Sequence, residues 1–209
     1  MTLLAVLDYL SVFIFALTGA LVASRAQLDL VGFLFIASLT AVGGGTIRDL
    51  LLNRDTVFWV ANPWYIATAS AAAVLVFFTA HRLESRRRAI DWLDAGALAV
   101  AVPAGVGVAM GLGHSPAVVL MMGMITGAFG GLMRDVVCNE VPLVLRQGEL
   151  YLSAAFAGAL MALGVEQVTG QMPWALLACA AMTFLLRAGS MAFGWKLPVY
   201  RARPPRDPS

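Results

Sequence analysis

Seven long apolar stretches follow one another through almost all of the 209 residues of this chain. A membrane-spanning helix needs about 20 mostly apolar residues, and each stretch is close to that length. Because short connections join them, the sequence predicts one transmembrane domain over residues 1–196 and no separate soluble domain. The predicted spans are 4–23, 30–52, 63–81, 92–110, 116–138, 149–165 and 173–193.

The composition fits the same class, since 60% of the residues are hydrophobic and only 12% are charged, against about 25% charged in soluble domains. The first span is interpreted as a helix and not as a signal peptide, because no Lys or Arg precedes it and the acidic Asp8 lies near its start. Two cysteines, Cys138 and Cys179, lie in apolar stretches, and His81 and His114 stand apart from them. We therefore expect no disulfide framework, no metal site, no cofactor and no enzyme activity.

Basic residues indicate how the chain crosses the membrane. Arg and Lys side chains gather on one face of the predicted topology, and the other face has only Arg48 and Arg54. By the positive-inside rule, the amino terminus is expected outside and the tail 197–209 in the cytoplasm. The net charge of +2 does not indicate nucleic-acid binding, because topology accounts for the arginines at the span ends.

The chain also aligns with itself, without gaps, at an offset of 86 residues (94 − 8). Glycine and charged positions that keep one register are unlikely to arise by chance, so the match indicates a duplicated unit. Repeat one covers about 4–81, repeat two covers about 90–167, and the seventh span, about 173–193, has no counterpart. The matching pairs are Asp8 with Asp94, Gly19 with Gly105, Thr40 with Thr126, Gly44-Gly45 with Gly130-Gly131, Arg48-Asp49 with Arg134-Asp135, Asn53 with Asn139, and Tyr65 with Tyr151.

Each repeat holds three spans, so the second copy enters the membrane from the opposite side. The fold class predicted is an all-α integral membrane protein with an inverted 3+3 repeat plus one extra helix. Several transport proteins build a central pathway in this way. The seventh helix is expected to pack against the outside of the pair or against neighbouring subunits.

Clustered glycines lie inside the second and fifth spans. The second span contains Gly43, Gly44 and Gly45 followed by Thr46, and the fifth contains Phe129, Gly130 and Gly131. Each interior glycine costs a helix about 1 kcal/mol relative to alanine, so both spans are predicted to break or kink there. Unwound backbone at membrane depth is tolerated only inside protein or along a watery cavity, which indicates a permeation or binding site. The alternative is that the glycines allow close helix packing.

An Arg-Asp pair follows each glycine cluster: Arg48-Asp49 in the first repeat and Arg134-Asp135 in the second. Ionisable residues within the membrane usually mark function. One hypothesis is that the pairs cross between repeats, Arg48 to Asp135 and Arg134 to Asp49. The alternative is that each arginine extends to a membrane surface.

Three further carboxylates, Asp8, Asp94 and Glu140, lie near span ends without an equally placed basic partner in the sequence. Surplus carboxylates along a pathway would favour cations over anions. Asp8 and Asp94 are equally well explained as helix N-cap residues, and Glu140 as a loop residue facing water.

The motifs 43–49 and 130–135, set in a seven-span inverted repeat, resemble prokaryotic members of the trimeric intracellular cation channel family, which also carry a glycine-transporter label. The resemblance implies a homotrimer in a bacterial inner membrane, surrounded by lipid, with one pore for K⁺ or Na⁺ in each protomer. It implies kinks at the glycines of both motifs and places Arg48, Asp49, Arg134 and Asp135 beside the pore.

Two departures from the family pattern stand out. Phe129 replaces the first glycine of the second motif, where it either stiffens the kink or places an aromatic ring in the pore. The Lys-Glu-Val tripeptide of the animal members is absent, because Lys196 is the only lysine, so lysine-dependent gating and phosphoinositide binding are not expected. A secondary transporter of a small solute such as an amino acid is the alternative function, and a non-transporting scaffold is a third.

Overall fold

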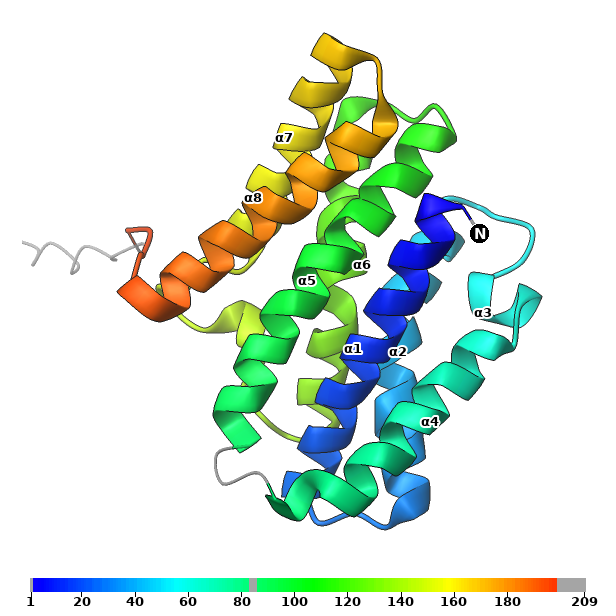
Figure 1. Cartoon of the computed structure of the whole chain (residues 1–209), viewed down its shortest axis with the longest axis vertical. Helices are drawn as coiled ribbons and strands as arrows, with labels where there is room; N and C mark the ends of the chain where they lie inside the picture. Colours follow the sequence, from blue (N-terminus) through cyan, green and yellow to red (C-terminus); the bar gives the residue numbers. More distant parts are fainter. Residues whose placement is uncertain (1, 83–85, 199–209) are drawn as a thin grey trace, which may run out of the picture.

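The computed structural model describes residues 2–82 and 86–198, and the regular elements in these ranges are all helices (Figure 1). Seven of them are long and apolar enough to cross a membrane, counting α4 and η1 as one, so the predicted all-α fold with seven spans is confirmed. Only the first two residues of the predicted tail, 197–209, lie inside the described ranges. The elements are α1 (Leu3–Arg25), α2 (Leu30–Leu51), α3 (Phe58–Ala61), α4 (Trp64–Thr79), η1 (Ala80–Arg82), α5 (Arg86–Gly111), α6 (Pro116–Val137), η2 (Leu143–Leu145), α7 (Leu152–Thr169) and α8 (Met172–Phe193).

The ends of α2 and α6 show how local sequence sets the boundaries in both repeats. Asp29 caps the start of α2 by accepting a hydrogen bond from the Gly32 amide at 2.8 Å, and α6 begins at Pro116, whose fixed φ suits a first helical turn. An asparagine in the left-handed region lies two residues after the end of each helix, Asn53 with φ 49° after α2 and Asn139 with φ 55° after α6. Asparagine tolerates this conformation, so the two helices end in the same way, 86 residues apart (139 − 53).

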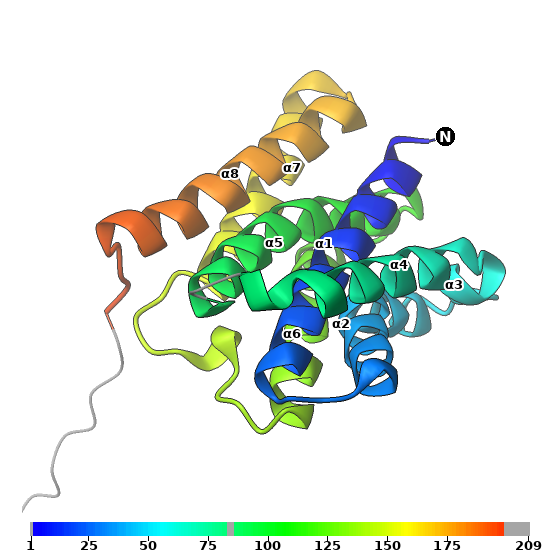
Figure 2. The same ribbon diagram turned by 60° about the horizontal axis from the view of Figure 1, so that its bottom comes forward.

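Four helices form the centre of the molecule, with α1 against α2, α2 against α6, α6 against α5 and α5 against α1. Figure 1 shows α1 and α5 running in opposite directions, as do α2 and α6. Helix α4 covers α1 and α2 on one side, and α7 covers α5 and α6 on the other (Figure 2). The unmatched helix α8 packs on α7 and α5, and so belongs to the side of repeat two.

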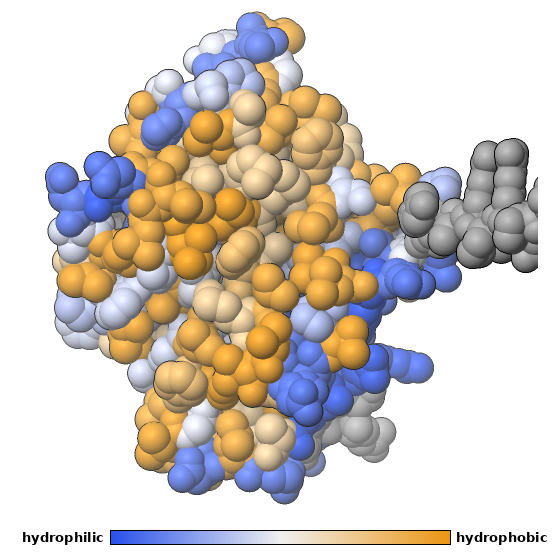
Figure 3. Space-filling model, turned by 180° about the vertical axis from the view of Figure 1, so that it is seen from behind, coloured by the Kyte–Doolittle hydropathy of each residue, from blue (hydrophilic) through white to orange (hydrophobic). Residues whose placement is uncertain are grey.

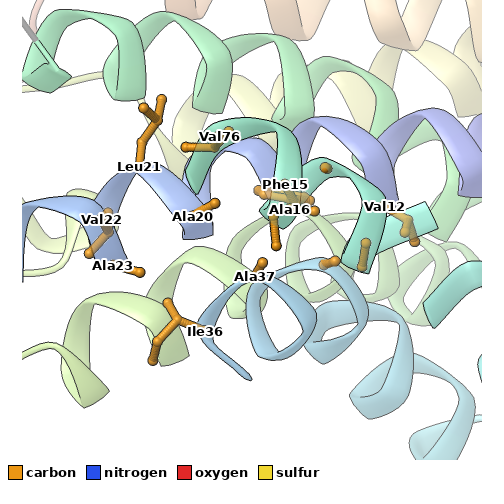
Figure 4. Close-up of a cluster of buried hydrophobic side chains, with 14 of the residues drawn as sticks. Val12, Phe15, Ala16, Ala20, Leu21, Val22, Ala23, Ile36, Ala37 and Val76 are labelled. Carbon is orange, nitrogen blue, oxygen red and sulfur yellow. The ribbon is translucent and has the colours of Figure 1, made fainter. Parts of the chain in front are cut away.

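Small residues fill much of the core between these helices. Ala16, Ala20 and Ala37 are fully buried where α1 meets α2, between larger side chains such as Phe15 and Ile36 (Figure 4). Small side chains let helix backbones approach closely, which is how membrane helices gain packing energy in the absence of a hydrophobic driving force.

Large apolar side chains point outward instead. Val31, Phe35, Trp64 and Phe78 each expose 60% or more of their surface, and Figure 3 shows apolar residues covering a broad face with hydrophilic residues gathered at its margins. A monomeric soluble protein rarely exposes so large a patch. This surface suits lipid and agrees with a multi-pass membrane protein.

Candidate functional site

Helices α2 and α6 continue through their glycines as uninterrupted α-helices, so the predicted break in each is wrong. The reason lies in how the two helices cross. A Cβ on Gly44 would overlap the carbonyl oxygen of Thr126, and a Cβ on Gly130 would overlap the carbonyl oxygen of Thr40. Glycine at these positions allows backbone-to-backbone contact, which is the alternative that the sequence left open. A bend at the glycines stays a prediction.

The other glycines of the motifs accommodate side chains. Gly45 lies under the Phe58 ring, where an added Cβ would be 2.6 Å from Phe58 Cε1. Its counterpart, Gly131, faces a polar group, since its Cβ would lie 3.3 Å from Asp94 Oδ1 and 3.6 Å from the Tyr151 hydroxyl. The two repeats thus share the helix crossing but differ in what surrounds it.

A buried ion cluster lies beside this crossing in repeat one. Arg48 is 0% exposed, and its Nε donates to Asp49 Oδ1 at 2.8 Å while its Nη1 donates to Asp8 Oδ1 at 3.0 Å. The guanidinium also lies over the Phe58 ring, 5.4 Å from the centroid. We call Asp8, Arg48 and Asp49 the first cluster.

Repeat two contains the equivalent group. Arg134 is also 0% exposed, with Nε donating to Asp135 Oδ1 at 2.7 Å and Nη1 donating to Asp94 Oδ1 at 3.2 Å. Nη1 donates as well to the Thr18 hydroxyl of α1 at 2.9 Å. We call Asp94, Arg134 and Asp135 the second cluster.

These clusters correct four interpretations made from the sequence. The crossed pairs are wrong, because each arginine binds carboxylates of its own repeat. Extension of the arginines to a membrane surface is wrong, because Arg48 and Arg134 are fully buried. Asp8 and Asp94 are not N-caps, since they lie inside α1 and α5, and both have a basic partner. A long arginine side chain can curl back to the carboxylate that follows it in the sequence, as Arg48 and Arg134 do.

The second oxygen of each helix-end aspartate fixes the loop that follows. Asp49 Oδ2 accepts a hydrogen bond from the Phe58 amide at 2.8 Å, and Asp135 Oδ2 accepts one from the Leu143 amide at 2.9 Å. In each repeat the loop residue so held opens a short helix, α3 or η2. The aspartates therefore connect the ion clusters to the chain at the ends of α2 and α6.

The surroundings of the first cluster are more open. The Asp8 side chain is 13% exposed, and Arg54, 39% exposed, reaches Asp49 at 3.3 Å. Arg54 also lines a hollow of about 410 Å³ together with Asn53 and Leu112. At the equivalent position repeat two has Glu140, which pairs with Arg25 at 3.4 Å.

The three remaining predicted site residues lie apart from the clusters' hydrogen bonds. Gly43 faces the Met133 side chain, which a Cβ would overlap. Thr46 accepts a hydrogen bond from the Trp59 indole at 2.9 Å and donates to the Val42 carbonyl oxygen at 2.7 Å. Phe129 is half-buried on α6. Among the described residues, no group of three or more His, Cys, Asp or Glu side chains could hold a metal ion.

Sequence reasoning missed several residues around the clusters. Thr18 has alanine at the matched position, 104, so the repeat gave no signal for it. Arg187 of α8 is one of the basic residues that the predicted topology places on one face of the membrane. It is fully buried, donates a hydrogen bond to Glu149 at 2.7 Å and lies 5.0 Å from the Tyr151 ring centroid. For Tyr151 the sequence did offer a signal, because the repeat matches it with Tyr65.

Each cluster sets two carboxylates against one guanidinium, but Arg54 adds a second guanidinium to Asp49, so that only the second cluster keeps one negative charge in excess among its ion pairs. Three buried atoms of these clusters have no hydrogen-bond partner in the protein: Arg48 Nη2, Arg134 Nη2 and Asp94 Oδ2. Buried polar atoms without a protein partner are generally satisfied by water or ions. Polar atoms without a protein partner thus lie in both clusters, one in the first and two in the second.

Fold and site together define an integral membrane protein with two oppositely oriented three-helix units and a buried ion cluster in each. A family model described as glycine transporter matches residues 5–81 and again residues 91–167, ranges that lie 86 residues apart (91 − 5). The chain is 35% identical to the UPF0126 inner membrane protein YadS of Escherichia coli, over 93% of this chain and 94% of the relative. It is also 35% identical to a UPF0126 membrane protein of Vibrio cholerae, over 95% and 83%.

Two solved structures share the fold. The TRIC trimeric intracellular cation channel orthologue from Rhodobacter sphaeroides is 41% identical, with a TM-score of 0.89 over 93% of this chain and all of that one (100%). A prokaryotic TRIC channel in 0.5 M KCl is 26% identical, with a TM-score of 0.86 over 93% and 98% of the two chains. This chain belongs to the trimeric intracellular cation channel family, whose bacterial sequences are also described as glycine transporter and UPF0126 proteins.

Proposed function

We propose that this protein is a channel for monovalent cations, K⁺ or Na⁺, whose pathway in each protomer runs past the α2–α6 crossing and both ion clusters. The observation that carries the proposal is the pair of buried clusters, each with two carboxylates to one guanidinium. Carboxylates along a pathway favour cations over anions. The similarity to solved TRIC cation channels supports the same function.

Buried charge, and not a broken helix, is the feature of α2 and α6 that points to a pathway. Charged groups are costly at membrane depth, and a buried ion pair needs nearly every donor and acceptor satisfied to offset its desolvation. Here one guanidinium nitrogen in each cluster and one carboxylate oxygen have no protein partner. Water accepting from the guanidinium nitrogens, and water or a cation at the Asp94 carboxylate oxygen, would supply the missing interactions and mark the route of permeation.

Purified protein in planar bilayers tests the proposal. With a KCl gradient of about tenfold across the bilayer, a cation-selective channel has a reversal potential clearly different from zero. We expect discrete currents that reverse near the K⁺ equilibrium potential. Asp8→Asn removes one negative charge from the first cluster and should move the reversal potential toward zero. Asp29→Asn is the matched control, because Asp29 caps α2 away from the clusters and asparagine caps equally well. Absence of unitary cation currents, or equal shifts in both variants, would contradict the proposal.

We further propose that the protein forms a homotrimer in a bacterial inner membrane, as its resemblance to the channel family implies. Its amino terminus would lie outside and its carboxyl terminus in the cytoplasm. The trimeric description of the similar structures supports the first part. Native mass spectrometry of the detergent-solubilised protein should give three times the chain mass, and a monomer alone would count against it.

A secondary transporter of a small amino acid is the second candidate. The glycine-transporter description of the matching family model favours it, and inverted repeats serve alternating access as well as conduction. Saturable uptake of labelled glycine into proteoliposomes, without unitary currents, would select this function over the channel.

A further inference from the structure

The contacts that join the two repeats are distributed unevenly between the ends of the molecule. Two polar contacts between described side chains cross from one repeat to the other: Thr18 with Arg134, and Arg25 with Glu140. Both join α1 to α6 or to the residues just after it, at the end that holds the second cluster. At the opposite end, which holds the first cluster, the equivalent contacts would join α5 to α2 or to the residues just after it.

Repeat symmetry shows why the opposite end lacks these contacts. The position matched to Thr18 is Ala104, which has no hydroxyl, and the position matched to Arg25 is Gly111, which has no side chain (offset 86). Arg54, matched to Glu140, binds Asp49 inside its own repeat at 3.3 Å. The helix crossing is therefore duplicated, whereas the polar connection across it is not.

The Thr18 contact is the stronger of the two on physical grounds. Thr18 is 0% exposed, and its hydroxyl donates to the Phe15 carbonyl oxygen at 2.8 Å, which orients its lone pairs to accept from Arg134 at 2.9 Å. A buried hydrogen bond to a charged group exceeds an ordinary one. The Arg25–Glu140 pair is about 30% exposed on each side, so it contributes less and salt screens it.

We propose that the Thr18–Arg134 hydrogen bond holds the pathway closed at the second-cluster end, and that Thr18 is a positioning residue which sets how often the channel opens. This inference rests on the proposed function, because it names the residue that regulates the same pathway. Any separation of α1 from α6 beside Arg134 must break this bond, whereas separation of α5 from α2 beside Arg48 breaks no equivalent one. Opening is therefore limited at one end.

Thr18→Val tests the proposal, since valine keeps the shape of threonine and removes the hydroxyl. We expect the ratio of open to closed time to rise about tenfold, the effect of losing one hydrogen bond to a charged group, with unitary conductance unchanged. Thr18→Ser keeps the hydroxyl and should stay close to wild type. Thr183→Val is the matched control, because Thr183 is another fully buried threonine, on α8, away from Arg134.

A second measurement separates this proposal from the channel function itself. Cys138 follows α6 and packs against a core cluster formed by α1, α2, α4 and α5, so a loosened α1–α6 contact should expose it to a water-soluble maleimide. Burial and the nearby Glu140 raise the pKa of the Cys138 thiol, which keeps wild-type labelling slow at about pH 8. Peptide mass analysis distinguishes Cys138 from the buried Cys179.

The outcomes are distinct. A rise in both opening and Cys138 labelling for Thr18→Val, but not for Thr183→Val, supports the proposal. If wild type carries no current, the channel function fails, and the labelling rate alone decides whether Thr18 holds α1 and α6 together. No change in either measurement, or an equal change in the Thr183 control, overturns the proposal.

Discussion

Replacing Gly44 by alanine tests whether the α2–α6 crossing is a direct backbone contact. A Cβ at this position would overlap the Thr126 carbonyl oxygen and lie 3.0 Å from its carbonyl carbon. These are backbone atoms, which cannot rotate away as a side chain can, so the helices must separate. Overpacking of this kind costs about 1–3 kcal/mol, and we take the upper value. The helix regains about 1 kcal/mol because alanine replaces an interior glycine, which leaves a net loss of about 2 kcal/mol.

Gly164→Ala on α7 is the matched control, because nothing lies within 4 Å of a Cβ built there. This variant has the propensity gain without the overlap, so its stability should rise by up to about 1 kcal/mol. Unfolding by sodium dodecyl sulfate in mixed micelles, followed by circular dichroism, measures both variants. The two substitutions are thus expected to act in opposite directions.

Symmetry adds a sharper test, since Gly130 meets the Thr40 carbonyl oxygen as Gly44 meets that of Thr126. Once either alanine has pushed the helices apart, the second finds more room. The Gly44→Ala, Gly130→Ala double variant should therefore lose clearly less than the sum of the single losses. Strict additivity would refute a shared crossing, and a Gly44→Ala variant as stable as Gly164→Ala would refute the close contact itself.

Two further predictions follow from the charges. Arg134→Ala leaves two buried carboxylates without their cation and should lower the free energy of unfolding by about 3–5 kcal/mol in the same assay. Arg146→Ala breaks a partly exposed pair and should lower it by under about 1 kcal/mol. Equal losses would contradict the buried cluster. A green fluorescent protein fused to the carboxyl terminus should fluoresce in cells and an alkaline phosphatase fused there should be inactive, while the reverse pattern would reject the proposed orientation.

The sequence predicted the spans and their pairing because both depend on composition and register. Seven apolar stretches of membrane length leave one fold class, and the matched glycines and charges at an offset of 86 point to the residues that recur at the crossing and in the clusters. Segment ends were less accurate: α5 begins at Arg86, six residues before the predicted start at 92. Nothing in the apolar pattern could reveal that nearly two additional helical turns, at about 3.6 residues per turn, precede the predicted membrane span.

The errors share one physical cause, which is that tertiary contacts overrode local preference. Glycine weakens an isolated helix, but around Gly44 and Gly130 the neighbouring helix supplies the packing that keeps α2 and α6 unbroken. The partners of Arg48 and Arg134 likewise depend on which helices pack side by side, and Asp8 and Asp94 become partners only when α1 lies on α2 and α5 on α6. Thr18 was missed because the repeat, the most informative signal, is silent where the two copies differ.

Several of those differences lie at the second-cluster end of the molecule. Thr18 binds Arg134, and Glu140 stands where repeat one has Arg54. The unmatched helix α8 adds the buried Arg187, which lies over the ring of Tyr151, whose hydroxyl is near Asp94. A perfectly symmetric pair of repeats would hold both ends with equal strength, so neither could be controlled alone. Among the described side chains, the polar contacts between the repeats lie only at the second-cluster end. On the proposed function this end is the harder one to open, and we therefore expect variants that change gating to concentrate there while Asp8 and Arg54 act mainly on ion entry.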